Sequence, residues 1–220
     1  MKIMAVVPMR GGSKSIPYKN IADLNGKPLC YYTLNELLKV EQIDKVVVST
    51  ENEKIKGAVN QLFNGKVFIL DRPAELASDT ATSEVVLSHV IEKIGQDYDY
   101  TLFAQCTSPL TEASDFVNLI DACGELDSAG FYTECYDYFY SIANDVELMV
   151  KPRQPRQLKT PRKKEAGNAW MFNNEGFLKH RTRLFGKIGM CKIDFIKNLE
   201  IDEPEDLEMF KGIMMTRGKI

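Results

Sequence analysis

The chain has 220 residues, of which 44% are hydrophobic and 27% are charged, and its formal net charge at pH 7 is -3. This length suits one sizeable α/β domain with a buried core. The charge argues against nucleic-acid and membrane-surface partners, because proteins that bind them usually carry a large basic excess. The apolar stretch before Arg10 is too short for a signal peptide, and no apolar run reaches the length of a membrane span, so we expect a cytoplasmic protein.

The first predicted strand covers 3–7, and the loop that follows it has the composition of an anion-binding site. It contains Gly11 and Gly12, which have no Cβ to keep a phosphate away from the backbone N–H groups. Its cationic side chains are Arg10, Lys14 and Lys19. Such cations can balance several negative charges at once. The alternative is an ordinary solvated loop between a strand and a helix.

Strands and helices alternate in the next part of the chain. The expected order is a helix over 27–38, a strand over 45–49, a helix over 53–63 and a strand over 66–70. The first of these strands reads KVVVS, and such a β-branched apolar run suits a strand that is buried on both faces. The alternation is typical of a parallel sheet covered by helices.

The segment 71–83 (DRPAELASDTATS) lacks a strand pattern and is rich in turn and capping residues. Its Ser83 is the predicted N-cap of a helix over 84–94. A fourth strand over 100–104 ends in the polar sequence QCTSPL. Ligands of open parallel sheets bind beyond the carboxyl ends of the strands. We therefore expect the loops after the first, third and fourth strands to converge on one rim.

The composition of the chain changes at about residue 134. Before this point we expect a helix over 114–123, capped by Ser114, and a weak strand over 128–133. The segment 151–164 (KPRQPRQLKTPRKK) contains seven Lys or Arg and three Pro, and the prolines argue against a regular helix or a central strand. Three interpretations stay open: a solvated extended loop, a nucleic-acid patch, or an arm that packs on a second subunit and lends a cation to an anionic substrate. The run has no aromatic residue for base stacking, which argues against the second.

The tail carries a pair of carboxylates near a predicted strand end. Short strands are expected over 169–172 and 188–193. Glu200 and Asp202 then lie in an extended segment that leads into a helix with Pro204 near its first turn. Alternate residues of a strand face the same side, so both carboxylates are expected on one face of the sheet. Such a pair suits Mg2+ when a substrate supplies phosphate oxygens, whereas the alternative is two acids stabilised by a helix start.

Several familiar functional patterns are absent. The sequence RGGSK lacks the spacing of a P-loop, and no GxGxxG follows the first strand, so neither an ordinary ATPase nor a dinucleotide oxidoreductase is indicated. The five cysteines never form a CxxC pair, which favours reduced thiols; only Cys106 is expected near the chemistry, and not as a nucleophile. His89 and His180 lie in unrelated contexts and give no Ser-His-Asp set.

Four segments in consistent order resemble the acylneuraminate cytidylyltransferases, namely RGGSKSIPYKN, DRPAELASDTATS, QCTSPL and EIDEPEDL. This family comprises CMP-sialic acid synthetases and their relatives for pseudaminic and legionaminic acids, with CMP-Kdo synthetases more distant. The resemblance implies a single nucleotidyltransferase domain over 1–220. Its α/β fold would be a Rossmann-like, mostly parallel sheet flanked by helices, with an inserted dimerisation and substrate arm at about 134–183.

The resemblance also implies an activity. CMP would pass from CTP to the anomeric hydroxyl of a nine-carbon 2-keto sugar acid, with release of pyrophosphate, in a homodimer that uses Mg2+. Such a transfer needs in-line positioning and neutralisation of the departing pyrophosphate, which positioned cations and a metal supply. The general base stays open between a metal-bound water or hydroxide and Asp202 acting through water.

Site residues follow from the same resemblance, position by position. The CTP phosphates would be held by Arg10, Ser13, Lys14 and Lys19, the ribose by Asn20, and the cytosine by Arg72, Ala81 and Ser83. The sugar acid would be approached by Gln105, Thr107 and Ser108, and the metal by Glu200 and Asp202. The expected catalytic residues are Arg10, Lys19 and Asp202.

Three positions depart from the usual pattern of the family. Thr111 stands where the family usually has arginine, which removes a cation near the expected substrate rim. Glu200 replaces an aspartate, so its carboxylate either ligates the metal directly or acts through a water. The order Gly167-Asn168-Ala169 differs from the Pro-Asn-Gly-Ala of sialic acid synthetases, which leaves the identity of the sugar acid open. The alternatives are a nucleotidyltransferase for Kdo or a sugar 1-phosphate, and a nucleotide-binding homologue without catalysis.

Overall fold

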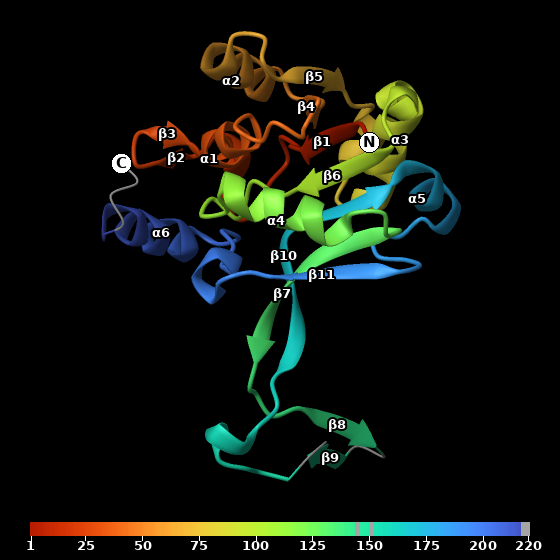
Figure 1. Cartoon of the computed structure of the whole chain (residues 1–220). Coiled ribbons are helices and arrows are strands. Elements are labelled where there is room, and N and C mark those ends of the chain that lie inside the picture. Colours follow the sequence, from red (N-terminus) through yellow and green to blue (C-terminus); the bar gives the residue numbers. More distant parts are fainter. Residues whose placement is uncertain (144–145, 150–151, 217–220) are drawn as a thin grey trace.

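The computed structural model of the protein describes residues 1–143, 146–149 and 152–216. Its body is a seven-stranded sheet with helices on both faces (Figure 1), and the strand order is β11-β7-β10-β6-β1-β4-β5. The strands of this sheet are β1 (Ile3–Pro8), β4 (Lys45–Thr50), β5 (Phe68–Asp71), β6 (Tyr100–Ala104), β7 (Ser128–Cys135), β10 (Arg162–Asn173) and β11 (Ile188–Lys192). The helices are α1 (Leu29–Leu37), α2 (Glu53–Phe63), α3 (Ser83–Ile94), α4 (Ala113–Cys123), α5 (Asn174–His180) and α6 (Pro204–Thr216).

The sheet is mostly parallel, as the alternation of elements predicted. Strands β1, β4, β5 and β6 pair in parallel, and so do β7 and β11. Only β10 runs antiparallel, to both of its neighbours β6 and β7. This strand breaks the pattern because it returns from an excursion of the chain, whereas the parallel strands are each joined by a crossover.

Alternate side chains of the central strands pack into two cores. Ile3, Ala5 and Val7 of β1 face a core that α1, α2 and α4 cover. Met4 and Val6 face the opposite core, which α3 and α5 cover. A third cluster joins α6 to the loop after β1 through Phe210, Met214 and Ile16. This last contact brings the tail of the chain beside the basic loop.

Two predicted helix caps are displaced by one or two residues. Helix α3 begins at Ser83, and its N-cap is Thr82, whose hydroxyl accepts the N–H of Val85. Helix α4 begins before the expected Ser114, because Glu112 and Asp115 form a reciprocal capping box. Both caps remain side-chain oxygens, so the sequence predicted the kind of helix start and missed its position.

The long antiparallel pair β7–β10 extends from the body as a stalk (Figure 1). Residues 162–164 of the basic run belong to β10, but there they pair with β7 alone, so they form neither a helix nor a central strand, as expected; all three prolines of the run precede Arg162. At the far end lie a short 3-10 turn (Arg156–Leu158) and the hairpin of β8 (Tyr140–Ala143) and β9 (Val146–Met149). The protruding part is shorter than the expected 134–183, because residues 169–173 pair with β6 and α5 packs on the sheet.

The remaining short elements are β2 (Asp23–Leu24), β3 (Lys27–Pro28) and the 3-10 turns Lys19–Ile21, Ala74–Ala77, Gly95–Asp97 and Phe195–Asn198. Among the residues that the structure describes, no helix combines the length and apolar character that crossing a membrane requires.

Candidate active site

A cleft of about 190 Å³ opens beyond the carboxyl ends of β1 and β6. The loops after β1, β5 and β6 all contribute to its wall, as expected for the ligand rim of a parallel sheet. Eight of the expected site residues line it: Arg10, Lys19, Asn20, Arg72, Ala81, Ser83, Gln105 and Thr107. The expected residues outside its wall are Ser13, Lys14, Ser108, Glu200 and Asp202.

The loop after β1 is held in place by groups that the sequence did not single out. The backbone N–H of Gly11 donates to the carboxylate of Glu51 (2.7 Å), and the side-chain amide of Asn20 donates to the carbonyl of Arg10 (2.9 Å). A Cβ at Gly11 would overlap the side-chain amide of Asn52, so the close approach requires glycine. Glu51 and Asn52 directly follow β4, and only this position at the sheet rim signals their role.

Two cations of this loop already hold an anion. Arg10 Nη1 and Lys14 Nζ contact the two carboxylate oxygens of Asp79, at 3.0 and 2.8 Å. The bond from Lys14 is the main reason that the pKa of Asp79 lies below its usual range. The carboxylate of Asp79 therefore stands in for an anionic ligand, and it shows that Arg10 and Lys14 can bind one anionic group together. Asp79 belongs to DRPAELASDTATS, but no local pattern revealed its partners.

Arg72 is fixed in the wall of the cleft by Ser49. Arg72 is 6% exposed, and its guanidinium donates to the Ser49 hydroxyl (3.2 Å) and carbonyl (2.5 Å). Burial lowers the pKa of Arg72, and the charge of Glu51 opposes this shift. A guanidinium held in this way presents a fixed donor edge and cannot swing freely.

Asn20 joins the loop to the strand β6. The thiol of Cys106 donates to the side-chain oxygen of Asn20 (2.9 Å). Burial raises the pKa of Cys106 to about 12, so this thiol stays protonated at neutral pH. Cys106 therefore lies beside the cleft without the thiolate character of a nucleophile, as the sequence predicted.

Glu200 and Asp202 lie beside the cleft, but not on a strand as expected. Their segment follows a 3-10 turn, and a backbone bond from the N–H of Ile201 to the carbonyl of Thr107 (2.8 Å) ties it to the β6 loop. Lys19 Nζ contacts the carboxylate of Asp202 at 2.8 Å. The hydroxyl of Thr107 donates to Glu200 Oε2 at 3.5 Å.

The two carboxylates are close enough to affect one another. Burial raises the pKa of Glu200, and the charge of Asp202 adds to this shift, whereas Thr107 and Lys19 oppose it. A different acid caps the start of α6: the carboxylate of Asp206 accepts the backbone N–H groups of Asp202 and Glu203 at 2.9 Å each. Asp206 thus performs the capping role that was the alternative for this pair.

A divalent cation would find an incomplete set of protein ligands here. No cluster of three or more His, Cys, Asp or Glu side chains suited to a metal occurs in the described part of the chain. The raised pKa of Glu200 beside Asp202 fits a pair of oxygens that a cation would stabilise. Phosphate oxygens and water would supply the other ligands of a hard ion.

The acceptor side of the cleft differs from expectation at two residues. Ser108 is fully buried and does not reach the cleft. Thr111 is 2% exposed, so it is not a rim position. Its hydroxyl donates to the Ser108 carbonyl (3.0 Å) and accepts the side-chain amide of Asn168 (2.8 Å). Gln105 and Thr107 remain as the polar side chains of the β6 loop that line the cleft.

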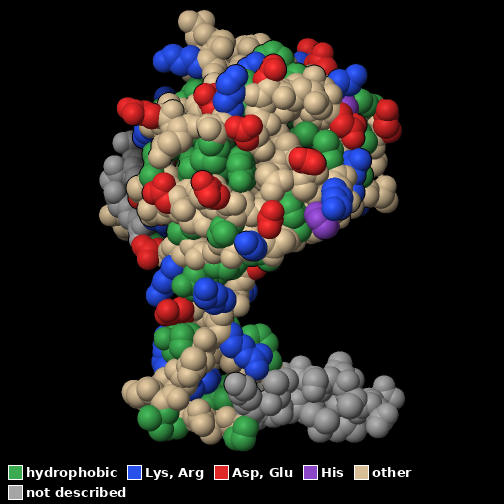
Figure 2. Space-filling model, turned by 45° about the vertical axis from the view of Figure 1, so that its right-hand side comes forward, with side chains coloured by type: hydrophobic (Ala, Val, Ile, Leu, Met, Phe, Trp, Pro, Cys, Tyr) green, Lys and Arg blue, Asp and Glu red, His purple; other side chains and the backbone are tan. Residues whose placement is uncertain are grey.

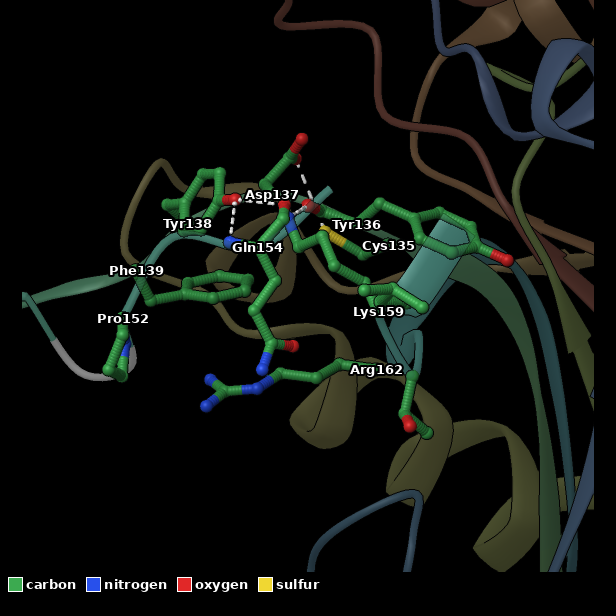
Figure 3. Close-up of a pocket in the computed structure, with 11 residues that line it drawn as sticks. Cys135, Tyr136, Asp137, Tyr138, Phe139, Pro152, Gln154, Lys159 and Arg162 are labelled. Carbon is green, nitrogen blue, oxygen red and sulfur yellow. Dashed lines mark hydrogen bonds between the residues drawn. The ribbon is translucent and has the colours of Figure 1, made fainter. Parts of the chain in front are cut away.

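A second cavity, of about 130 Å³, lies within the arm (Figure 3). The Tyr138 hydroxyl donates to the carbonyl of Gln154 and accepts its N–H, at 2.7 and 2.9 Å. Arg162 lies over the ring of Phe139, and Lys159 over that of Tyr138. The stalk is rich in Lys and Arg side chains (Figure 2). Aromatic rings thus support the cations of this segment, which the composition of 151–164 alone did not reveal.

The sequence and the structure are similar to those of known cytidylyltransferases. A family model described as "Cytidylyltransferase" matches residues 4–217. The N-acylneuraminate cytidylyltransferase of Escherichia coli O18:K1:H7 is 37% identical over 99% of this chain and 53% of its own length. The pseudaminic acid cytidylyltransferase of Campylobacter jejuni is 36% identical over 50% of this chain and 48% of its own. This chain thus spans about half the length of these relatives.

Solved structures of related fold align over almost the whole chain. A CMP:2-keto-3-deoxy-manno-octonic acid synthetase complexed with CTP has a TM-score of 0.77 at 16% identity, and covers 99% of this chain and 100% of its own. A 4-diphosphocytidyl-2C-methyl-D-erythritol synthase from Anaerococcus prevotii has a TM-score of 0.74 at 14% identity, with 97% and 98% covered. At these identities the likeness concerns the fold.

Proposed function

The chain belongs to the cytidylyltransferase family, and from this premise we propose that it transfers CMP from CTP to the anomeric hydroxyl of a nonulosonic, sialic-type sugar acid, with release of pyrophosphate. One observation carries the proposal. In one cleft region, Arg10 and Lys14 bind a carboxylate where a phosphate is expected, and Lys19 contacts Asp202 of the acid pair. A triphosphate needs such cations, and a departing pyrophosphate needs its charge neutralised.

The roles of the nucleotide-binding residues follow from the wall of the cleft. Arg10, Lys14 and Lys19, with Ser13 of the same loop, would hold the phosphates once the triphosphate displaces Asp79. Asn20 would contact the ribose. Arg72, Ala81 and Ser83 would surround the cytosine, for which the fixed guanidinium of Arg72 offers hydrogen-bond donors.

The acceptor would lie beside Gln105 and Thr107. Both side chains line the cleft and differ in position from the cations of the β1 loop. Ser108 has no such role because its side chain is buried. Asp202, exposed and held by Lys19, would receive the hydroxyl proton through water as the sugar oxygen attacks the α-phosphate.

Glu200 and Asp202 would hold Mg2+ together with phosphate oxygens. When bound, the ion would help to neutralise the charge of the pyrophosphate. Glu200 would present its carboxylate beside Thr107, and Asp202, which contacts Lys19, would supply the second carboxylate. Lys19 would also bind the departing phosphates.

We further propose that the protein is a cytoplasmic homodimer that associates through the arm. Within the described part of the chain, no ion pair involves Arg153, Arg156, Lys159 or Arg162, although each lies over an aromatic ring. A positively charged surface of this kind suits an acidic face of a second copy or the carboxylate of its substrate.

A pyrophosphate-release assay tests the activity. CTP is offered with a panel of nonulosonic acids and with Kdo, and the other nucleoside triphosphates are offered with sugar 1-phosphates. Release only with CTP and a nonulosonic acid is expected. Release with Kdo or with a sugar 1-phosphate would assign another acceptor class. Calorimetric binding of CTP without release on any acceptor would identify a nucleotide-binding protein that has lost catalysis.

A further inference from the structure

The pairing of β10 with β7 is interrupted beside the cleft. Ala166 pairs with Phe131 of β7, and the next paired residue, Trp170, lies opposite the adjacent Gly130. Residues 167–169 therefore bulge out of the β7 ladder without partners on that strand. Such a bulge aims backbone groups away from the sheet, and here they point toward the cleft residues of the β6 loop.

The bulge is fixed by hydrogen bonds on both sides. The carbonyls of Gly167 and Asn168 accept from the side-chain amide and the backbone N–H of Gln105, at 2.7 and 2.9 Å. The side chain of Asn168 is 1% exposed and donates to the Thr111 hydroxyl (2.8 Å) and to the Lys197 carbonyl (2.7 Å). The backbone at residue 167 therefore has little freedom to move.

The space in front of Gly167 is filled by the carboxylate of Glu200. A Cβ at Gly167 would overlap Glu200 Oε1 and would lie 3.0 Å from its Cδ. No other residue contributes to this contact among the nearest atoms. Because the carboxylate is the end of a flexible side chain and the bulge is fixed, a side chain at residue 167 would displace the carboxylate and leave the backbone in place.

We propose that Gly167 is a positioning residue that sets where the Glu200 carboxylate lies, between Thr107 and Asp202, and so enables Glu200 to act with Asp202 on a divalent cation. This inference rests on the proposed function for the metal. The sizes of residues 167 and 200 depend on one another, because the longer side chain of Glu200 leaves room only for glycine at 167. An aspartate at 200, shorter by one methylene, leaves room for alanine at 167.

The test compares CTP binding by calorimetry in Mg2+ and in EDTA. For the wild type we expect tighter binding in Mg2+. In Gly167→Ala this Mg2+-dependent gain falls by roughly 10- to 100-fold, as is typical when a group that orients a metal ligand is lost, while binding in EDTA is unchanged. In the double variant Gly167→Ala/Glu200→Asp the gain returns in large part. Gly57→Ala is the matched control, since nothing lies within 4 Å of a Cβ at that helical position.

Three outcomes overturn the inference: an undiminished Mg2+-dependent gain in Gly167→Ala, no such gain in the wild type, or no recovery in a folded double variant. Thermal unfolding in EDTA distinguishes two causes of a lost gain. A variant whose carboxylate is displaced still unfolds cooperatively, whereas a variant that has lost the fold shows no transition. If Gly167→Ala does not fold, the double variant decides, because relief of the overlap restores both its folding and its Mg2+ response. The pyrophosphate assay of the wild type tests the proposed function separately.

Discussion

Arg10 makes its polar side-chain contacts with one loop, through the carboxylate of Asp79 and the carbonyl of Ser78. Neither contact belongs to a hydrophobic core. We expect Arg10→Ala to lower the rate of pyrophosphate release by about 100-fold or more, the usual effect of removing a preorganised charge-stabilising donor. The melting temperature is expected to stay close to that of the wild type.

Lys66→Ala is the matched control for Arg10→Ala, because Lys66 is exposed in the loop before β5, at the amino end of that strand, and does not line the cleft. It should leave both readouts unchanged. Turnover by Arg10→Ala at the wild-type rate would remove this residue from the phosphate site. A large loss of stability would instead show that Arg10 has a structural role.

The pKa of Glu200 predicts how stability depends on pH. Burial and Asp202 raise this pKa in the folded protein, so the folded state binds the proton more tightly than the unfolded chain does. Ionisation of Glu200 above the raised pKa therefore costs stability, and this cost disappears as the pH falls through that pKa. Without metal, Glu200→Gln should melt at a higher temperature than the wild type at neutral pH.

The advantage of Glu200→Gln should shrink as the pH falls toward the ordinary glutamate pKa of about 4.3. Thermal unfolding in EDTA across a pH series measures this difference in melting temperature between the variant and the wild type. Glu41→Gln, at an exposed position, is expected to show no such trend. A Gln variant that is less stable than the wild type at neutral pH would mean that the hydrogen bond from Thr107 and the charge of Lys19 outweigh burial.

At the scale of elements, the bulge of β10 and the β6 loop support one another. Removal of the buried Asn168 side chain leaves the Thr111 hydroxyl and the Lys197 carbonyl without this donor. We expect Asn168→Ala to reduce the free energy of unfolding by about 2–3 kcal/mol, measured by denaturant titration. Asn60→Ala on the exposed face of α2 is the control, and an equally small effect in both variants would contradict a structural role for the bulge.

Local patterns predicted most elements and missed what depends on distant partners. The strands β1, β4 and β6 appear as short apolar runs, and α2 begins and ends where its helical spacing does. The cap of α3 shifted by one residue because the neighbours Thr82 and Ser83 are both suitable N-cap residues. Residues 162–164 form a strand because β7 offers them a ladder, which composition does not encode.

The same limit applies to the site. The cations of the β1 loop and the acid pair were evident from residue type, whereas Asp79 and Glu51 act through contacts between loops. The three departures from the family pattern also meet only in space. Thr111 is bound to Asn168, and Glu200 fills the space in front of Gly167. Each departure is thus accommodated by another, which a linear sequence does not display.

The whole molecule consists of a compact body and an arm that shares no core with it. None of the buried clusters that the structure describes includes a residue from 136–161. Cys135 and Arg162 are register partners at the end of the stalk, so a short Gly-containing turn can join them. We expect this shortened protein to fold with a melting temperature similar to that of the full chain and to be monomeric, as measured by light scattering.

The proposed homodimer is tested by the same comparison. A full chain that is monomeric at the concentrations used would remove the arm as an association element. A shortened protein that remains dimeric would assign the interface to the body. Lys66→Ala in the full chain is the control: it removes one cation and leaves the arm intact, so we expect it to remain dimeric.

The register pairing of Cys135 with Arg162 has a consequence for how such a protein can change over generations. Because the arm leaves and re-enters the sheet at facing residues, insertions or deletions beyond that pair do not alter the path of the body. The far end of the arm can therefore change in sequence or length while the packing around the cleft stays the same. With the proposed association through the arm, assembly and chemistry would be separately variable traits in one chain.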